Sequence, residues 1–308
     1  MEPWIILVAI AVISDATSTY TDNYITDVYF KDRLAMAQKV FHGFAFILVA
    51  VLFLCFSGVN FAAIASTAVG VLIIAGIING LSDIPYYKAI ETSSATEVGI
   101  FFQLSPVFYL IAGFLFLHEE ITPLQFLAFF MILLAPIIII LSTRKRSRKI
   151  KFRAAMYVAL YLLIDVATNL VFLTTEGESL DIYQSIAFML LGKGISSVLV
   201  TICWPKARRR WKSVMKSSKG KVLRPLTLDF ALVLIYDVSY RLALASAPVV
   251  ALASAACDAA APIVIFFLGL LFTLLWPKFG REDMRRKAIL AHLTATVLVV
   301  VGIVLLQF

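Results

Sequence analysis

Long uninterrupted apolar runs limit the possible folds of this chain more than any other feature. One of them, FAFILVAVLFLCF, extends from Phe44 to Phe56 without a charged residue. Such runs fit membrane-spanning helices, which need about 20 apolar residues each, better than the alternating strands of a membrane β-barrel. Hydrophobic residues make up 61% of the chain, whereas soluble domains are about 45–50% apolar. We therefore expect an all-α polytopic membrane protein.

Ten segments have the length and the apolar character of a membrane span. They cover residues 3–20, 34–57, 62–87, 95–117, 122–142, 153–174, 182–203, 227–246, 249–276 and 288–307. Ten spans leave almost no length for a soluble domain, so the sequence predicts a protein that lies almost entirely within the bilayer.

Basic residues gather in three of the predicted loops. Residues 144–153 contain seven basic residues and no acid, residues 204–225 contain nine and no acid, and residues 278–287 contain five with two acids. In a ten-span topology these loops share one side, and the acidic loop TEGESLD lies on the other. The positive-inside rule explains the clusters better than nucleic-acid binding does. It predicts cytoplasmic basic loops and external termini. We expect the membrane to be a bacterial or archaeal inner membrane.

The acids within the predicted spans indicate an internal repeat. Asp83 lies 154 residues before Asp237, and Asp15 lies 150 residues before Asp165. Five spans on each side of the basic linker give each half an odd number, so the two halves would be inverted. The expected division is a first five-helix repeat at 1–143, a linker at 144–152 and a second five-helix repeat at 153–308.

Each repeat-matched acid begins a polar stripe along its helix, because positions i, i+3 and i+4 share one face. Tyr86 follows Asp83 by three residues, and Tyr240 follows Asp237 by three. The residue four positions after the acid differs between the halves. It is Arg241 in the second half and a tyrosine in the first. The sequences DATST and DVATN carry hydroxyl or amide side chains at the corresponding places.

Two interpretations of these acids remain open. An ionisable side chain at mid-bilayer costs about 2.5–3.5 kcal/mol, so each one has a structural or a functional reason to be there. At about 1.5 Å per residue, Asp15 and Asp165 lie roughly 18 Å along their helices. The acids either line a transport site or pair with bases in the spans, which are Lys39, Lys193 and Arg241.

Two stretches give the chain a family resemblance. LSPVFYLIAGFLFLHEEITPLQF runs from Leu104 to Phe126, and AIETSSATEVGIFFQLSP runs from Ala89 to Pro106. Both resemble the helix three to helix five region of the EamA branch of the drug/metabolite transporter superfamily. The second half departs from the pattern, with WPKFGRED after its helix nine. The resemblance implies a ten-helix inverted-repeat carrier whose central cavity is lined by six helices. Those helices carry Asp15, Asp83, Glu97, Asp165, Asp237 and Asp258.

The expected function is secondary transport of a small polar metabolite, by export or exchange with alternating access. Acids outnumber bases in the spans, which favours an amine, an amino acid or another cationic or zwitterionic solute. Carboxylates in a low dielectric can exchange protons near neutral pH, so proton coupling is possible. Tyrosine rings can hold an organic cation. The candidate site residues are Asp15, Asp83, Tyr86, Glu97, Asp165, Asp237, Tyr240, Arg241 and Asp258.

Three other functions are alternatives to transport of a polar solute. A lipid-linked flippase would use the basic loops to meet anionic head groups, and a nucleotide-sugar antiporter would need bases in its cavity. An intramembrane enzyme is the weakest alternative, because the three histidines are far apart and no nucleophile motif occurs. The widely spaced Cys55, Cys203 and Cys257 give no metal motif. We expect no cofactor, and a monomer or weak homodimer.

Overall fold

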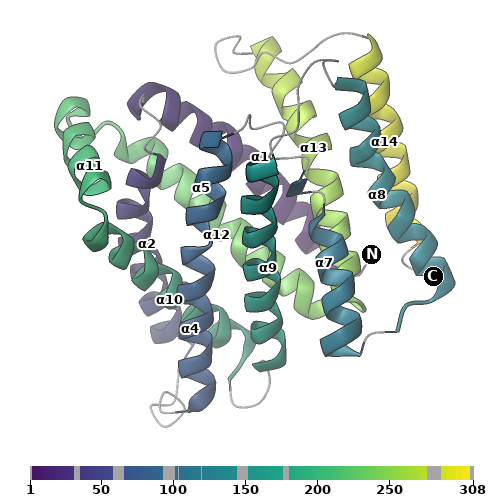
Figure 1. The fold of residues 1–308 in the computed structure, drawn as a ribbon, viewed down its shortest axis with the longest axis horizontal. Helices are drawn as coiled ribbons and strands as arrows, with labels where there is room; N and C mark the ends of the chain where they lie inside the picture. The colour runs from purple at the N-terminus through teal and green to yellow at the C-terminus, as the bar shows by residue number, and fades with distance from the viewer. Residues whose placement is uncertain are drawn as a thin grey trace. The chain divides into compact units, whose positions relative to one another are not determined.

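The structure is a computed structural model of the chain, and the part that it describes is almost entirely helical (Figure 1). It describes residues 2–30, 35–57, 66–92, 101–102, 104–118, 120–143, 152–175, 180–275 and 286–305. No β-strand occurs among these residues. Helices are found within each of the ten segments predicted to span the membrane.

The helices are long, with few residues between them. In chain order they are α1 (Pro3–Tyr29), the 3-10 helix η1 (Ala35–Gln38), α2 (Lys39–Phe56), α4 (Thr67–Leu81), α5 (Asp83–Thr92), α7 (Ser105–Ala112), the π-helical turn η2 (Gly113–Leu117), α8 (Pro123–Thr143), α9 (Phe152–Thr175), α10 (Ile182–Cys203), α11 (Pro205–Ser218), α12 (Leu223–Ser246), α13 (Val250–Leu275) and α14 (Arg286–Leu305).

Six helical segments of the described chain are long and apolar enough to cross a bilayer. They are Pro3–Thr26, Lys39–Phe56, Thr67–Ala89, Phe152–Thr175, Ile182–Cys203 and Val250–Leu271. Three shorter apolar segments occur in α7 with η2, in α8 and in α14. The helix α12 differs from the six because it carries Arg224, Asp229, Asp237 and Arg241. The chain is thus an all-helical membrane protein, while the count of ten spans stays a prediction.

Two elements differ from the sequence-based expectation. The predicted third span is interrupted at Ser82, and α5 begins at Asp83. Pro85 has no N–H to donate to the Leu81 carbonyl, so a helical hydrogen bond is lost at this point. The basic stretch expected as a loop contains α11. Its Pro205 occupies the first turn, where the missing N–H costs nothing. Ala207 and Val214, seven residues apart, are its buried face.

The described chain forms two compact units, each drawn from both halves of the sequence. Unit 1 comprises Met1–Tyr20, Ser93–Phe152 and Leu232–Phe308, and unit 2 comprises Thr21–Thr92 and Arg153–Ala231. The helices α1 and α12 contribute residues to both units. The predicted five-helix repeats describe a symmetry of the sequence, whereas these units describe which residues pack together. The division into two repeats therefore stays a prediction.

In unit 2, α10 packs against both α2 and α4 (Figure 1). Small residues allow the close approach of these backbones, as in many membrane helix pairs. A methyl group added at Gly76 would collide with the Met189 carbonyl, and one at Gly192 would collide with the Ile73 carbonyl. A methyl group at Gly194 would lie 3.0 Å from the backbone nitrogen of Ile47. The GKGISS stretch of α10 therefore serves helix packing.

In unit 1, α13 packs against α7, α8 and α14, and α8 lies along α14 (Figure 1). Gly302 of α14 permits the latter contact, because a methyl group there would lie 2.6 Å from Cγ1 of Ile132. In the same unit the Tyr20 hydroxyl of α1 donates to the Ile265 carbonyl of α13 at 2.8 Å. Unit 1 therefore combines small-residue packing with a hydrogen bond between helices.

Candidate functional site

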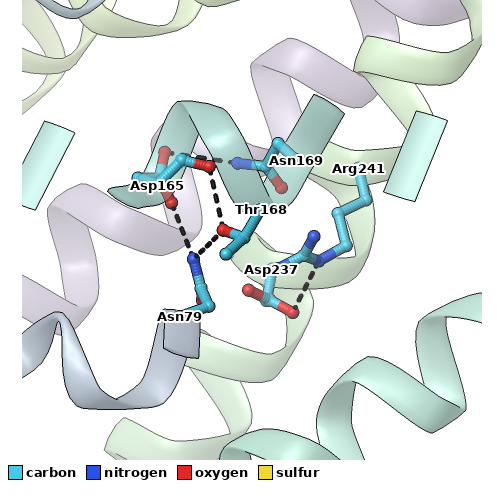
Figure 2. Close-up of polar contacts among 6 residues, drawn as sticks. All are labelled: Asn79, Asp165, Thr168, Asn169, Asp237 and Arg241. Atoms are coloured by element: carbon cyan, nitrogen blue, oxygen red, sulfur yellow. Dashed lines mark hydrogen bonds and ion pairs between the residues drawn. The ribbon is translucent and has the colours of Figure 1, made fainter. Parts of the chain in front are cut away.

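A hydrogen-bonded network joins α4 to α9 around Asp165, and Figure 2 shows its members. The Asn79 amide donates to Asp165 Oδ1 at 3.1 Å and to the Thr168 hydroxyl at 2.9 Å. One turn along α9, the Asn169 amide donates to Asp165 Oδ2 at 3.2 Å. Two neutral amides thus orient both carboxylate oxygens. We call Asn79, Asp165, Thr168 and Asn169 the Asn79 network.

Aromatic contacts continue this pairing of helices toward the start of α9. The ring centroids of Tyr86 and Tyr161 lie 5.8 Å apart, and the Lys88 ammonium lies 5.9 Å from the Tyr157 ring centroid. Tyr161 and Asp165 are one turn apart, so they share a face of α9. Tyrosine rings from α5 and α9 therefore lie near the oriented carboxylate, as a site for an organic cation requires.

A second polar group in unit 2 surrounds the start of α2. The Lys39 ammonium forms an ion pair with the Asp83 carboxylate, which stands in the first turn of α5. The Gln38 amide donates to Asp22 Oδ1 at 2.5 Å. Tyr87 interacts with Gln38 and with Asp22. The members of this group, which we call the α2 polar cluster, are Asp22, Gln38, Lys39, His42, Asp83, Tyr87 and Asp229.

Within the α2 polar cluster, His42 and Asp229 form a buried pair. His42 Nε2 lies 3.5 Å from Asp229 Oδ2, and the two residues are 7% and 2% exposed. Both interact electrostatically with Asp22. The cluster thus brings two carboxylates from α1 and α12 to one histidine of α2.

In unit 1, Asp237 and Arg241 form an ion pair along α12. Arg241 Nε donates to Asp237 Oδ2 at 3.2 Å (Figure 2). Arg241 is 2% exposed, so the guanidinium charge is buried with its partner. The Tyr240 ring stacks on Tyr236 at a centroid distance of 5.6 Å. The structure therefore favours charge pairing for Arg241, because its guanidinium points to Asp237.

Asp15 and Asp258 belong to one neighbourhood in unit 1. The Ser254 hydroxyl donates to Asp258 Oδ2 at 3.2 Å and lies 3.5 Å from the Ser105 hydroxyl of α7. Both Asp15 and Asp258 act electrostatically on the buried Cys257. Helices α1, α7 and α13 thus bring two acids and two serines together.

The predicted site residues fall into separate groups. Asp83 and Tyr86 lie on α5, Asp165 lies in the Asn79 network, and the Asp237 pair is in unit 1. Glu97 lies outside the described residues. Within the described chain, no group of three or more histidine, cysteine or acidic residues is arranged to hold a metal ion.

Sequence reasoning missed Asn79, Asp22, His42 and Asp229 as site residues. A helical spacing signal was available for two of them. Asp22 follows Asp15 by seven residues, and Asp229 precedes Asp237 by eight, which places each pair on one helix face. His42 and Asn79 carry no such signal, because their importance comes from contacts with other helices.

Long apolar helices with hydrogen-bonded carboxylates and buried ion pairs define a polytopic membrane protein with a charged interior. Residues 2–141 match the EamA-like transporter family, which places this part of the chain in a family of the drug/metabolite transporter superfamily. The predicted resemblance is confirmed over residues 2–141, and this match implies a membrane transporter of the superfamily.

The fold also resembles solved structures. One crystal structure matches with a TM-score of 0.62 and 18% sequence identity, over 98% of this chain and 95% of the other. At that identity the likeness supports the fold alone. No curated protein matches the chain by sequence.

Proposed function

We propose that the protein is a secondary transporter that exports or exchanges a small cationic or zwitterionic solute, such as an amine or an amino acid. The observation that carries this proposal is the geometry around Asp165. Its carboxylate is held by amides from α4 and α9 and lies in the middle of α9. An acid fixed in this way attracts a positive group without having to reorganise when the solute arrives.

The neighbouring tyrosines support an organic ammonium as the bound group. Tyr86 contacts Tyr161, one turn before Asp165, and also contacts Tyr87 at a centroid distance of 5.4 Å. A ring face adds about 0.5–2 kcal/mol to the binding of a cation, depending on how dry the site is. Carboxylate and rings together favour an amine over an inorganic cation.

The remaining predicted acids receive different roles under this proposal. Asp83 and Asp237 have basic partners in Lys39 and Arg241, so they contribute mainly to stability. Asp15 and Asp258 belong to unit 1 and share the surroundings of Cys257. We assign them a part in solute transport within unit 1. Alternating access moves the solute across the membrane, and the basic loops face the cytoplasm.

A binding screen tests the proposed substrate class. Purified protein in detergent is titrated with amines, amino acids and nucleotide sugars at pH 6 and pH 8, and its thermal midpoint is measured. We expect stabilisation by amines or amino acids and its loss in Asp165→Asn. Stabilisation by nucleotide sugars alone, or amine binding that is unchanged in Asp165→Asn, contradicts the assignment.

A further inference from the structure

We propose, on the basis of the transport function above, that His42, Asp229 and Asp22 form a proton-binding site that couples proton movement to transport. The site shares no residue with the Asn79 network. It consists of one imidazole from α2 and two carboxylates, from α1 and α12. Histidine is the side chain whose ordinary charge change falls between pH 5 and 8, which suits a physiological proton exchange.

The Nε2 atom of His42 faces the Asp229 carboxylate and can accept a proton. Its Nε2 has no hydrogen-bond partner among the described residues, although the atom is buried. The carboxylate oxygen Asp229 Oδ2 lies 3.5 Å from it. Protonation of Nε2 forms an N–H bond that can donate toward this carboxylate, and release of the same proton restores the neutral ring. A buried nitrogen without a partner is unfavourable, and an N–H bond at Nε2 directed to Asp229 would relieve this.

Aromatic rings hold the imidazole in this orientation. The His42 ring lies 5.9 Å from the Phe230 ring, 6.1 Å from Phe41 and 6.4 Å from Phe46, measured between centroids. Phe230 directly follows Asp229 in α12, so the same helix turn positions both the acid and the packing ring. An imidazole packed against these rings has little freedom to turn its Nε2 away from the Asp229 carboxylate.

Two carboxylates, Asp22 and Asp229, interact with the single imidazole of His42. Lys39 of α2 pairs with Asp83 of α5, and Lys193 of α10 lies 6.0 Å from the Phe46 ring centroid. Gln38 of η1 gives a neutral hydrogen bond to Asp22, and Tyr87 of α5 adds a phenol. Lys39 also acts electrostatically on Asp22, so His42 is the member of this group whose charge can change near neutral pH. Loss of the proton therefore makes the buried site more negative, a change that uptake of a cationic solute can offset.

An apolar core shared with α11 adjoins this site. Ile25 follows Asp22 by one helix turn, and Leu226 precedes Asp229 by one turn. Both are fully buried in a core to which α11 contributes Val214. The members of this α11 core are Ile25, Phe30, Ala37, Val214, Val222 and Leu226. A dry core of this kind strengthens the electrostatic interactions beside it and keeps protons from leaking.

A solid-state NMR titration tests the proton site without any substrate. Protein labelled with ¹⁵N-histidine is reconstituted in lipid, and the tautomer and charge of His42 are followed from pH 5 to pH 8. The His42 signals are assigned with His42→Gln. We expect His42 to change its charge in this range. In Asp229→Asn its proton affinity should fall about tenfold, because the neighbouring negative charge is gone. Asp22→Asn serves as a second carboxylate variant if Asp229→Asn does not fold.

The same variants are then compared in transport. Proteoliposomes are assayed with L-arginine and L-alanine as cationic and zwitterionic probes, once by exchange at equal pH and once with an imposed pH gradient. His42→Gln and Asp229→Asn are expected to lower the ratio of gradient-driven transport to exchange several-fold. The matched control is His118→Asn, because His118 is exposed and has a positive φ that asparagine tolerates.

The two proposals fail in different ways. A His42 that keeps one charge state from pH 5 to pH 8, or that titrates identically in Asp229→Asn, overturns the proton site whatever the transport result. An unchanged gradient-to-exchange ratio in His42→Gln also overturns it. Wild-type vesicles that transport neither probe argue against the proposed substrate class, while the NMR titration still decides whether the proton site exists.

Discussion

Asn79 and Asp165 are 86 residues apart in the chain, yet the Asn79 amide nitrogen lies 3.1 Å from the Asp165 carboxylate. The same amide also donates to Thr168 at 2.9 Å. One asparagine of α4 therefore fixes both the acid and its neighbour on α9. This relationship gives a costly intramembrane carboxylate hydrogen-bond donors and a fixed orientation.

The first prediction concerns the energy of this contact. Asn79→Ala removes two hydrogen bonds between helices, each worth about 0.6 kcal/mol on average in membrane proteins, so the free energy of unfolding should fall by about 1–2 kcal/mol. Unfolding in mixed micelles measures this change. The control is Thr174→Ala, because the Thr174 hydroxyl bonds only to carbonyls of its own helix in the hydrogen bonds resolved here. Equal stability of the two variants would show that the network contributes nothing.

The second prediction concerns the Asp237–Arg241 pair. Arg241→Ala leaves a buried carboxylate without its guanidinium, which should cost about 3–5 kcal/mol of stability. The double variant Asp237→Asn with Arg241→Gln removes both charges and should be clearly more stable than Arg241→Ala. A double-mutant cycle of unfolding free energies gives the coupling. Strictly additive single effects would mean that the ion pair is not a stabilising unit.

The third prediction concerns the close approach of α4 and α10. Gly76→Ala places a methyl group against the Met189 carbonyl, and such overpacking costs about 1–3 kcal/mol. Gly70→Ala in the same helix has nothing within 4 Å of the added methyl group. It should leave stability unchanged or raise it by up to about 1 kcal/mol through helix propensity. Thermal midpoints in detergent compare the two, and a tolerated Gly76→Ala would contradict the packing.

The fourth prediction concerns the aromatic part of the proposed solute site. Tyr161→Leu removes the ring beside Tyr86 and should weaken the binding of an amine about 2- to 30-fold, the range expected for one cation–π contact. Tyr161→Phe keeps the ring face and serves as the matched variant. Isothermal titration with the best amine from the screen measures both. If Tyr161→Leu binds as tightly as Tyr161→Phe, the ring takes no part in recognition.

The helices were largely predictable from the sequence, because apolar runs report burial in lipid directly. The pairing of Arg241 with Asp237 was also accessible, since their spacing of one turn places them on one face. Helix α11 was not predicted, because its six basic residues conceal the buried positions Ala207 and Val214. The interruption at Ser82 was missed although the sequence contains its signal, because Pro85 lacks the N–H that would bond to the Leu81 carbonyl.

The candidate sites were predictable only in part. Repeat matching found Asp165 and Asp83, since both copies of a repeat leave traces in the sequence. It could not find Asn79 or His42, whose partners lie on other helices and come from distant parts of the chain. A sequence shows which residues share a helix face, but contacts between helices appear only once the helices are packed.

Transport by proteoliposomes containing Asp165→Asn tests the central claim most directly. Asp181→Asn is the matched control, because Asp181 caps α10 and asparagine caps a helix equally well. Exchange of the amine or amino acid selected by the screen is measured for the wild type and both variants after equal reconstitution. We predict activity in the wild type and in Asp181→Asn, and loss of at least nine-tenths of it, about tenfold, in a folded Asp165→Asn. Wild-type exchange by Asp165→Asn would contradict the account.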